Sequence, residues 1–97
     1  MEVHIDDKIY VVKWQHSQYN STHRVSNGTT QCSIDDIKNT MPVHDATGIC
    51  ICALGDNYDK NKGRKISMQR ALEELDLSRS HRQIFWDAYY EMRNNKW

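Results

Sequence analysis

The amino-acid sequence predicts an α+β fold, in which a small and mostly antiparallel sheet of roughly three to five strands is followed by two C-terminal helices packed on one face. Three observations support this prediction. Residues 1–34 are rich in β-branched and aromatic types, the apolar period changes from two to about 3.6 after Gly55, and 97 residues are too few for two independent cores. We therefore expect one domain over residues 1–97, strand-rich in 1–55 and helical in 56–97.

Two β-prone runs open the chain, at residues 3–5 and 9–14, and a polar step at Asp6-Asp7 separates them. A hairpin and one long bent strand both fit this pattern. Residues 15–28 are polar and lack apolar periodicity, so they predict a mobile loop that ends in a tight turn at Asn27-Gly28. The alternating residues 29–34 predict the strand that follows this turn.

The next segment contains one ambiguous region and one clear strand. Residues 35–48 fit a short helical turn or a hairpin tip, and Pro42 excludes a central strand through them. Residues 47–54 are a continuously apolar run bounded by Gly48 and Gly55. This run predicts a strand that is buried on both faces and lies in the middle of the sheet.

The second half of the chain predicts two helices. Asp56 or Asn57 is expected to cap the first, and Gly63 indicates either that this helix begins near Arg64 or that a close approach leaves no room for a side chain. Helical spacing predicts its buried side: Ile66, Met68, Ala71, Leu72 and Leu75. Ser78 is expected to cap a last helix over residues 79–95.

The charge of the chain excludes two classes of function. Its 13 basic residues balance 13 acidic ones, and the isoelectric point is near 6.9, so neither a generic nucleic-acid binder nor an acidic DNA mimic is expected. Residues 1–59 carry four basic and eight acidic side chains, whereas residues 60–97 carry nine basic and five acidic ones, which gives charges of −4 and +4. The positive charge is concentrated between Lys60 and Arg70.

Composition also bears on location and chemistry. The apolar stretches are far shorter than the roughly 20 residues of a membrane span, and the first residues lack the apolar region of a signal peptide, so we expect a cytoplasmic protein with reduced cysteines. The four candidate metal ligands lack the C-x2-C spacing of a zinc site: Cys32, His44, Cys50 and Cys52. The five histidines are scattered, with no cysteine, serine or carboxylate at a spacing that signals a nucleophile and base pair, and the acid pairs Asp6-Asp7 and Asp35-Asp36 fit loop tips. We therefore expect no metal, no cofactor and no catalytic residue.

The predicted ligand site is the glycine-bounded segment 55–65 together with the helix that follows it. Backbone N–H groups at a helix N-terminus and mobile basic side chains suit a phosphate, and a tyrosine ring can stack on a base. The residues predicted to bind are Asn57, Tyr58, Lys60, Arg64, Lys65 and Arg70, with Arg79 and Arg82 as a second basic pair beside Trp86. A solvated helix face is the alternative explanation of the same charges.

The last helix predicts self-association. Apolar residues make up only 38% of the chain, yet large apolar residues occupy a wide arc of this helix, and a homo-oligomer would bury them. The expected interface residues are Phe85, Trp86, Tyr89 and Tyr90.

A resemblance adds an expectation about function. The segments that carry it are residues 29–34 (TTQCSI), 48–52 (GICIC), 56–60 (DNYDK), 63–67 (GRKIS), 70–72 (RAL) and the R-x3-W-x2-Y pattern from Arg82 to Tyr89. They resemble small phage-encoded accessory proteins, and in particular the Thoeris anti-defence sponge family, whose members bind and sequester cyclic ADP-ribose-type and related nucleotide signals. The resemblance implies a non-enzymatic protein that captures such a signal in the host cell. Small phage anti-CRISPR inhibitors, which act by protein–protein contact on a host nuclease or effector complex, are the alternative.

Overall fold

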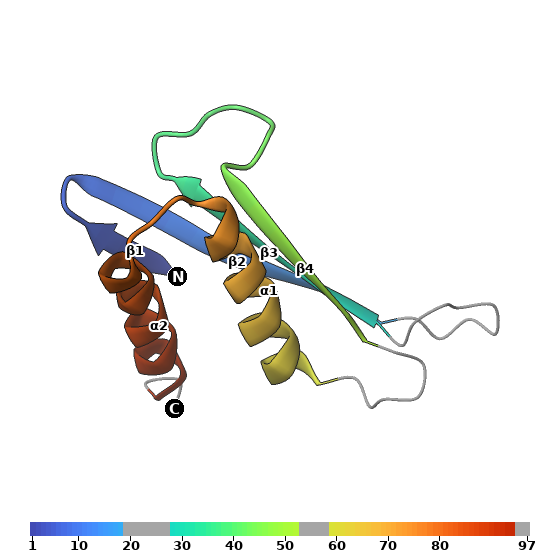
Figure 1. Ribbon diagram of the computed structural model, residues 1–97. Helices are drawn as coiled ribbons and strands as arrows, with labels where there is room; N and C mark the ends of the chain where they lie inside the picture. Colours follow the sequence, from blue (N-terminus) through green and yellow to red (C-terminus); the bar gives the residue numbers. More distant parts are fainter. Residues whose placement is uncertain (19–27, 53–58, 95–97) are drawn as a thin grey trace.

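The computed structural model describes residues 1–18, 28–52 and 59–94. Its strands and helices are β1 (Glu2–Ile5), β2 (Lys8–Gln18), β3 (Gly28–Asp36), β4 (Ala46–Cys52), α1 (Lys60–Glu74) and α2 (Arg79–Asn94). The strands form an antiparallel sheet in the order β1-β2-β3-β4, and both helices lie on one side of it (Figure 1). The predicted α+β fold with two C-terminal helices on one face is therefore confirmed.

β1 and β2 form a hairpin, which is the first of the two predicted arrangements. Ile5 pairs with Lys8 across a turn at Asp6 and Asp7. Asp6 adopts a φ of 53°, a left-handed conformation that aspartate tolerates better than most residues. The prediction that Asp6 and Asp7 are turn residues is confirmed.

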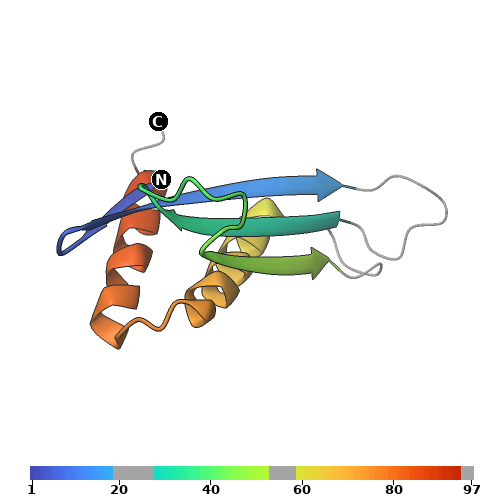
Figure 2. The same cartoon turned by 90° about the horizontal axis from the view of Figure 1, so that it is seen from above.

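β2 is longer than predicted. The expectation of a loop from residue 15 is wrong, because residues 15–18 continue β2 and pair with residues 28–31 of β3. Gln15 pairs with Gln31, and both lie on the sheet face opposite to that of buried Val12 and Ile34. The helices leave this face uncovered (Figure 2), so polar side chains are tolerated on it. Gly28 is a strand residue without a positive φ, not a turn glycine, and Asn27 lies outside the described residues.

β4 lies at the edge of the sheet, so the prediction of a central strand is wrong. Ala46 and Gly48 are buried beneath α1, whereas Ile49 and Ile51 are 47% and 64% exposed on the uncovered face. The pattern misleads because the positions that face the helix are small or weakly polar, and the outward positions are isoleucines. Without a contrast between polar and apolar positions, periodicity cannot distinguish an edge strand from a central one.

Two glycines allow α1 to pack closely on the sheet. A Cβ at Gly48 would lie 2.1 Å from the carbonyl oxygen of Ser67 and 2.4 Å from the backbone nitrogen of Ala71. A Cβ at Gly63 would lie 2.4 Å from Oγ1 of Thr30 on β3. The sequence left two explanations for Gly63: a helix that begins near Arg64, or a close approach that leaves no room for a side chain. Since Gly63 is inside α1, the close approach is correct.

Asp59 caps the N-terminus of α1. Oδ1 of Asp59 accepts hydrogen bonds from the backbone N–H groups of Asn61, at 2.9 Å, and Lys62, at 3.3 Å. The predicted caps, Asp56 and Asn57, are therefore wrong, because they precede the residue whose carboxylate reaches the free N–H groups of the first turn.

α2 begins after Ser78, whose Oγ accepts the backbone N–H of His81 at 3.3 Å, so this predicted N-cap is confirmed. Phe85 and Tyr89 have no exposed surface, and the ring centroid of Tyr89 lies 5.8 Å from that of Trp14 on β2. Both side chains are covered by the sheet of their own chain. Neither is available for the predicted oligomer interface.

The core lies between the sheet and the two helices. Its residues are Val3, Ile5, Tyr10, Val12, Cys32, Ile34, Ala46, Met68, Ala71, Leu72, Phe85 and Tyr89. α1 packs on β3 and β4, and α2 packs on β1, so a groove remains between the helices. In the described ranges, neither helix combines the length and the apolar character that crossing a membrane requires.

Candidate ligand-binding site

The structure separates the basic residues that the sequence groups together on α1. The guanidinium of Arg70 donates to the carbonyl oxygen of Ile49 at the sheet edge. Nζ of Lys65 lies 5.6 Å from the ring centroid of Tyr90 on α2. Because these residues occupy different faces of one helix, they do not form a single site.

One cavity gathers basic and aromatic side chains from several elements. It measures about 540 Å³ and is walled by β2, α1, the C-terminal part of α2 and the first residue. The lining residues are Met1, Val12, Lys13, Trp14, His16, Arg64, Met92 and Arg93. We call this cavity the Trp14 pocket. Of the predicted ligand residues that the structure describes, Arg64 lines this pocket.

Two guanidinium groups converge beside this pocket. Nη1 of Arg64 donates to Oδ1 of Asn61 at 3.0 Å, and Nη1 of Arg93 donates to the same oxygen. The ion pairs within the described ranges all contain a histidine, so neither guanidinium is paired there with a carboxylate. Two unit charges about 4 Å apart near a protein surface repel by about 1–4 kcal/mol, and an anion placed between them would offset this repulsion.

The indole of Trp14 has a fixed orientation in the pocket wall. Its Nε1 donates to the carbonyl oxygen of Arg64 at 3.3 Å. Its ring makes an edge-to-face contact with Tyr89, with an interplanar angle of 63°. An indole held in this way provides a flat, polarizable surface for another aromatic ring beside the two guanidiniums.

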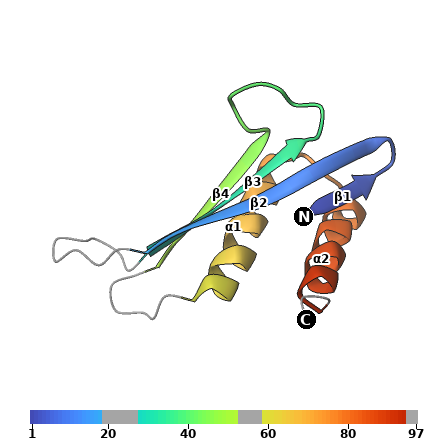
Figure 3. The same ribbon diagram turned by 180° about the vertical axis from the view of Figure 1, so that it is seen from behind.

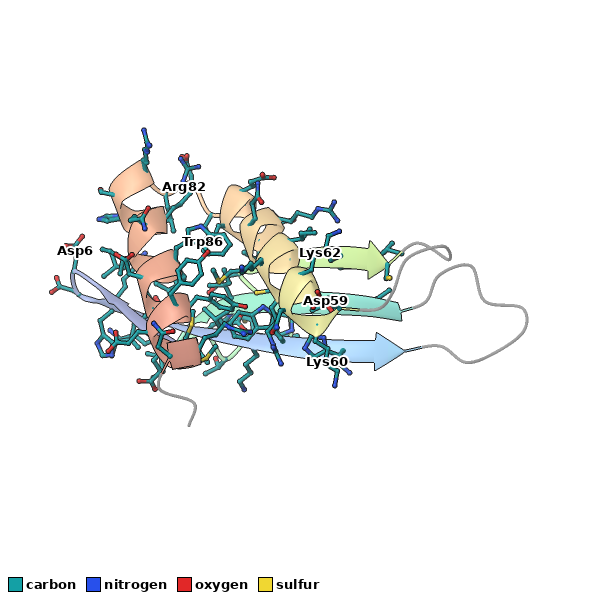
Figure 4. The ribbon with its side chains drawn as sticks, turned by 90° about the horizontal axis from the view of Figure 1, so that it is seen from below. Asp6, Asp59, Lys60, Lys62, Arg82 and Trp86 are labelled. Carbon is teal, nitrogen blue, oxygen red and sulfur yellow. The ribbon has the colours of Figure 1, made fainter. Side chains whose placement is uncertain are left out.

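His16 lies in the pocket wall, where burial and nearby positive charges both act on its ring. Its pKa is lowered from the usual value, first by burial and then by the positive charges of Arg64 and Lys60. Nδ1 of His16 lies 2.8 Å from Oγ1 of Thr30, which fixes the ring against β3. The predicted ligand residue Lys60 therefore acts on this pocket through its charge, at the exposed start of α1 shown in Figure 4.

The remaining predicted residues fall elsewhere. Arg79 and Arg82 line a second cavity of about 380 Å³ between the helices, together with Leu72, Glu73 and Trp86. We call this cavity the α1–α2 groove. Figure 4 shows Trp86 reaching from α2 toward α1 with Arg82 close by, so the predicted neighbourhood of this arginine and Trp86 is confirmed.

Two predicted ligand residues, Asn57 and Tyr58, lie outside the described residues. The predicted ligand residues also omit Trp14 and His16, and they omit Arg93 although the sequence groups it with Arg79 and Arg82 on the last helix. These three omitted residues are distant from the basic segment along the chain, and no local spacing connects them to it. Only the packing of α1 and α2 against β2 brings them together.

Cys32 is poorly suited to a reactive site. Cys32 has no exposed surface, and burial raises the pKa of its thiol to about 12, so the thiolate form is strongly disfavoured. Within residues 1–18, 28–52 and 59–94, no three histidine, cysteine or acidic side chains are placed to hold a metal ion.

Fold and cavity together define an α+β protein with a basic, aromatic-walled pocket. Comparison of the chain with protein-family models, curated protein sequences and solved structures gives no significant match. The functional argument therefore depends on the pocket residues themselves.

Proposed function

We propose that this chain is a non-enzymatic binding protein that captures a small phosphorylated, nucleotide-type ligand in the Trp14 pocket. One observation carries the proposal: Arg64 and Arg93 converge on a single neutral oxygen beside the indole of Trp14, without a carboxylate partner in the described part of the chain. A phosphate is the natural acceptor for two such groups, since its oxygens accept several charge-assisted hydrogen bonds at once.

The shape of the pocket agrees with a ligand of this class. Its volume of about 540 Å³ falls in the usual range for small-molecule sites, roughly 300–1,000 Å³. Apolar walls from Val12, Trp14 and Met92 would cover a base, while Arg64 and Arg93 hold the phosphate. The ligand would also reduce the positive potential that lowers the pKa of His16.

The resemblance to Thoeris anti-defence sponges suggests the biological role. In that role the chain is a phage protein in the cytoplasm of the host cell, and the ligand is a cyclic nucleotide or cyclic ADP-ribose-type immune signal. Binding alone withholds the signal from its effector, so neither a catalytic residue nor a cofactor is needed.

The test measures binding and ligand recovery together. The protein is titrated by calorimetry with cyclic ADP-ribose and with 3′,5′-cyclic nucleotides, then denatured, and the released small molecule is identified by mass spectrometry. We expect saturable binding and return of the ligand intact. Arg64→Ala and Arg93→Ala should each weaken binding at least about tenfold, since a charge-assisted hydrogen bond contributes about 1.5–3 kcal/mol.

Lys8→Ala is the matched control, because it removes one positive charge from the distant β1–β2 hairpin and should leave the affinity unchanged. Binding that survives both arginine substitutions would place the ligand elsewhere on the molecule. Recovery of a cleaved product would show that the chain is an enzyme and would contradict the proposal.

The anti-CRISPR alternative is favoured by a different observation, the exposed aromatic side chain of Tyr90. Tyr90 is 48% exposed and neighbours half-buried Trp86, and exposed aromatic side chains of this kind are enriched at protein–protein interfaces. In this case Trp86→Ala and Tyr90→Ala would abolish inhibition of a host nuclease or effector complex. Arg64→Ala would leave that inhibition intact.

A further inference from the structure

The connection between β3 and β4 exposes apolar side chains on an ordered backbone. Within this segment, residues 37–45, Ile37 is 50% exposed, Met41 72% and Val43 73%. We call it the Met41 loop. It rises from the end of the sheet on the side away from the helices, as Figures 1 and 3 show.

Short polar side chains hold the Met41 loop in place. Oδ1 of Asp35 accepts the backbone N–H of Asp45 at 2.9 Å and Nδ2 of Asn39 at 3.2 Å. Oδ2 of Asp35 lies 2.8 Å from Nδ1 of His44, and Nδ2 of Asn39 also donates to the carbonyl oxygen of Val43. These hydrogen bonds come from polar side chains and the backbone, and none of them uses the side chain of Ile37, Met41 or Val43.

The base of the loop is acidic. Asp35, Asp36 and Asp45 lie together there, and Oδ2 of Asp45 accepts the backbone N–H of Asp36 at 2.7 Å. Lys38 is the one lysine or arginine of the segment. The Met41 loop therefore presents a preorganised apolar tip on a negatively charged base, which suits an apolar cavity with a positive rim.

The α1–α2 groove has that complementary chemistry. Buried Leu72 and half-buried Trp86 give it an apolar base, and the exposed residues Arg79 and Arg82 contribute positive charge. No described carboxylate pairs with either arginine. Glu73 also lines the groove and would complement Lys38 of an incoming loop.

We propose that the Met41 loop of one copy of this chain docks in the α1–α2 groove of a second copy. Met41 and Val43 enter the groove, and Asp35, Asp36 and Asp45 approach Arg79 and Arg82. This proposal is independent of the ligand proposal, because it uses no side chain of the Trp14 pocket.

The contact is head-to-tail. The loop lies on one side of the sheet and the groove lies on the other, so a docked pair of chains keeps one free loop and one free groove (Figure 1). Further copies add in the same direction until a ring closes or a filament grows.

Pairing through the free edge of β4 is the competing mode, and side chains of α1 oppose it. The carboxylate of Glu74 accepts the backbone N–H of Thr47 at 3.2 Å, and the guanidinium of Arg70 donates to the carbonyl oxygen of Ile49. These two bonds occupy a backbone N–H group and a carbonyl oxygen at the edge of β4, which a second strand would need for its own hydrogen bonds.

The test uses two variants that each lose one half of the contact. The loop variant carries Met41→Asp and Val43→Asp, and the groove variant carries Arg79→Glu and Arg82→Glu. Sedimentation velocity of the full chain should show a mass that rises with concentration. The mass should fall at 1 M salt, where charges are screened beyond about 3 Å instead of about 10 Å. Either variant alone should be monomeric at concentrations at which the wild type associates.

An equimolar mixture of the two variants is the decisive sample. Each variant keeps the half that the other lacks, so the mixture should form a dimer and nothing larger. The variant Arg64→Ala with Arg93→Ala is the control and should associate as the wild type does. Circular dichroism checks that each variant folds. If the loop variant does not fold, Met41→Ser with Val43→Ser replaces it, and if the groove variant does not fold, Arg79→Gln with Arg82→Gln replaces it.

Three results would overturn the proposal. A wild-type chain that stays monomeric up to its solubility limit has no such contact. Oligomers that persist in both variants and disappear with Ile49→Lys use the β4 edge instead. A mixture of variants that remains monomeric shows that loop and groove do not recognise each other.

Discussion

Replacing Gly48 by alanine is expected to destabilise the fold through one contact between α1 and β4. Gly48 has no positive φ, so its backbone accepts alanine without strain. The obstacle is the helix: the new Cβ would lie 2.1 Å from the carbonyl oxygen of Ser67, about 1.3 Å short of the 3.4 Å at which ordinary van der Waals contact begins. The backbone nitrogen of Ala71 and Cβ of Arg70 are also too close, at 2.4 and 2.9 Å.

The magnitude follows from two opposing effects. Loss of backbone freedom in the unfolded chain would stabilise an alanine variant by about 0.4–1 kcal/mol at an unstrained position. Overpacking costs about 1–3 kcal/mol, and here the upper end applies because rigid helix backbone, not a flexible side-chain tip, must move. We expect a net loss of about 2 kcal/mol in the free energy of unfolding, which lowers the Tm by about 8–16 °C in a chain of this size.

Urea denaturation followed by circular dichroism measures this loss. Ile51→Ala is the control, since Ile51 lies on the same strand but faces away from α1, and its replacement should cost less than about 1 kcal/mol. A Gly48→Ala variant with an unchanged or higher midpoint would refute the close packing of α1 on β4.

Three further predictions concern a cap, a carboxylate and a thiol. Asp59→Ala should lower the free energy of unfolding by about 1 kcal/mol and Asp59→Asn by much less, because asparagine also caps; denaturant midpoints distinguish them. Burial alone would raise the pKa of Asp35, but hydrogen bonds from Asp45, His44 and Asn39 and the charge of His44 hold this pKa below its usual value. The stabilisation is therefore complete above about pH 4 and is lost as the pH falls through the lowered pKa, so wild type and Asp35→Asn should converge in stability in acid and diverge toward pH 5. Cys32, in a variant with Cys50→Ser and Cys52→Ser, should resist a thiol reagent at pH 8 until urea unfolds the chain.

Each of these has a clear contrary result. Equal midpoints for Asp59→Ala and wild type would show that the cap does not stabilise α1. A stability difference between wild type and Asp35→Asn that persists unchanged to pH 2 would contradict the lowered pKa. Rapid labelling of Cys32 in native buffer would contradict its burial.

The fold could be predicted from the sequence to the level of class and element order, because those depend on local signals. The change of apolar period after Gly55 and the cap at Ser78 are local, and the structure confirms the helices they predict. The position of β4 is not local. It depends on which strands pair, and Ile49 and Ile51 carry no information about whether another strand lies beyond them.

The candidate site was harder to predict for the same reason. Arg64 and Arg70 are close in sequence, yet one lines the Trp14 pocket and the other bonds to the sheet edge, since six residues on a helix do not return to the same face. Trp14 and Arg93 are far from Arg64 in sequence and meet it only in the folded chain. A pocket whose lining comes from separate elements of the chain leaves no local motif.

Two side chains of α1 bond to the edge of β4, so the solubility of the protein depends on α1 staying packed on the sheet. Arg70 and Glu74 bond to backbone groups at the edge of the outermost strand, and α1 also covers the face of that strand that carries Ala46 and Gly48. If α1 detaches, both forms of protection are lost in one step. The result is a strand without charged residues that exposes Ile49 and Ile51 and is free along one edge, which is the type of segment that seeds aggregation. Substitutions that weaken the packing of α1 on the sheet, such as Gly48→Ala, are therefore expected to cause precipitation before the sheet itself unfolds.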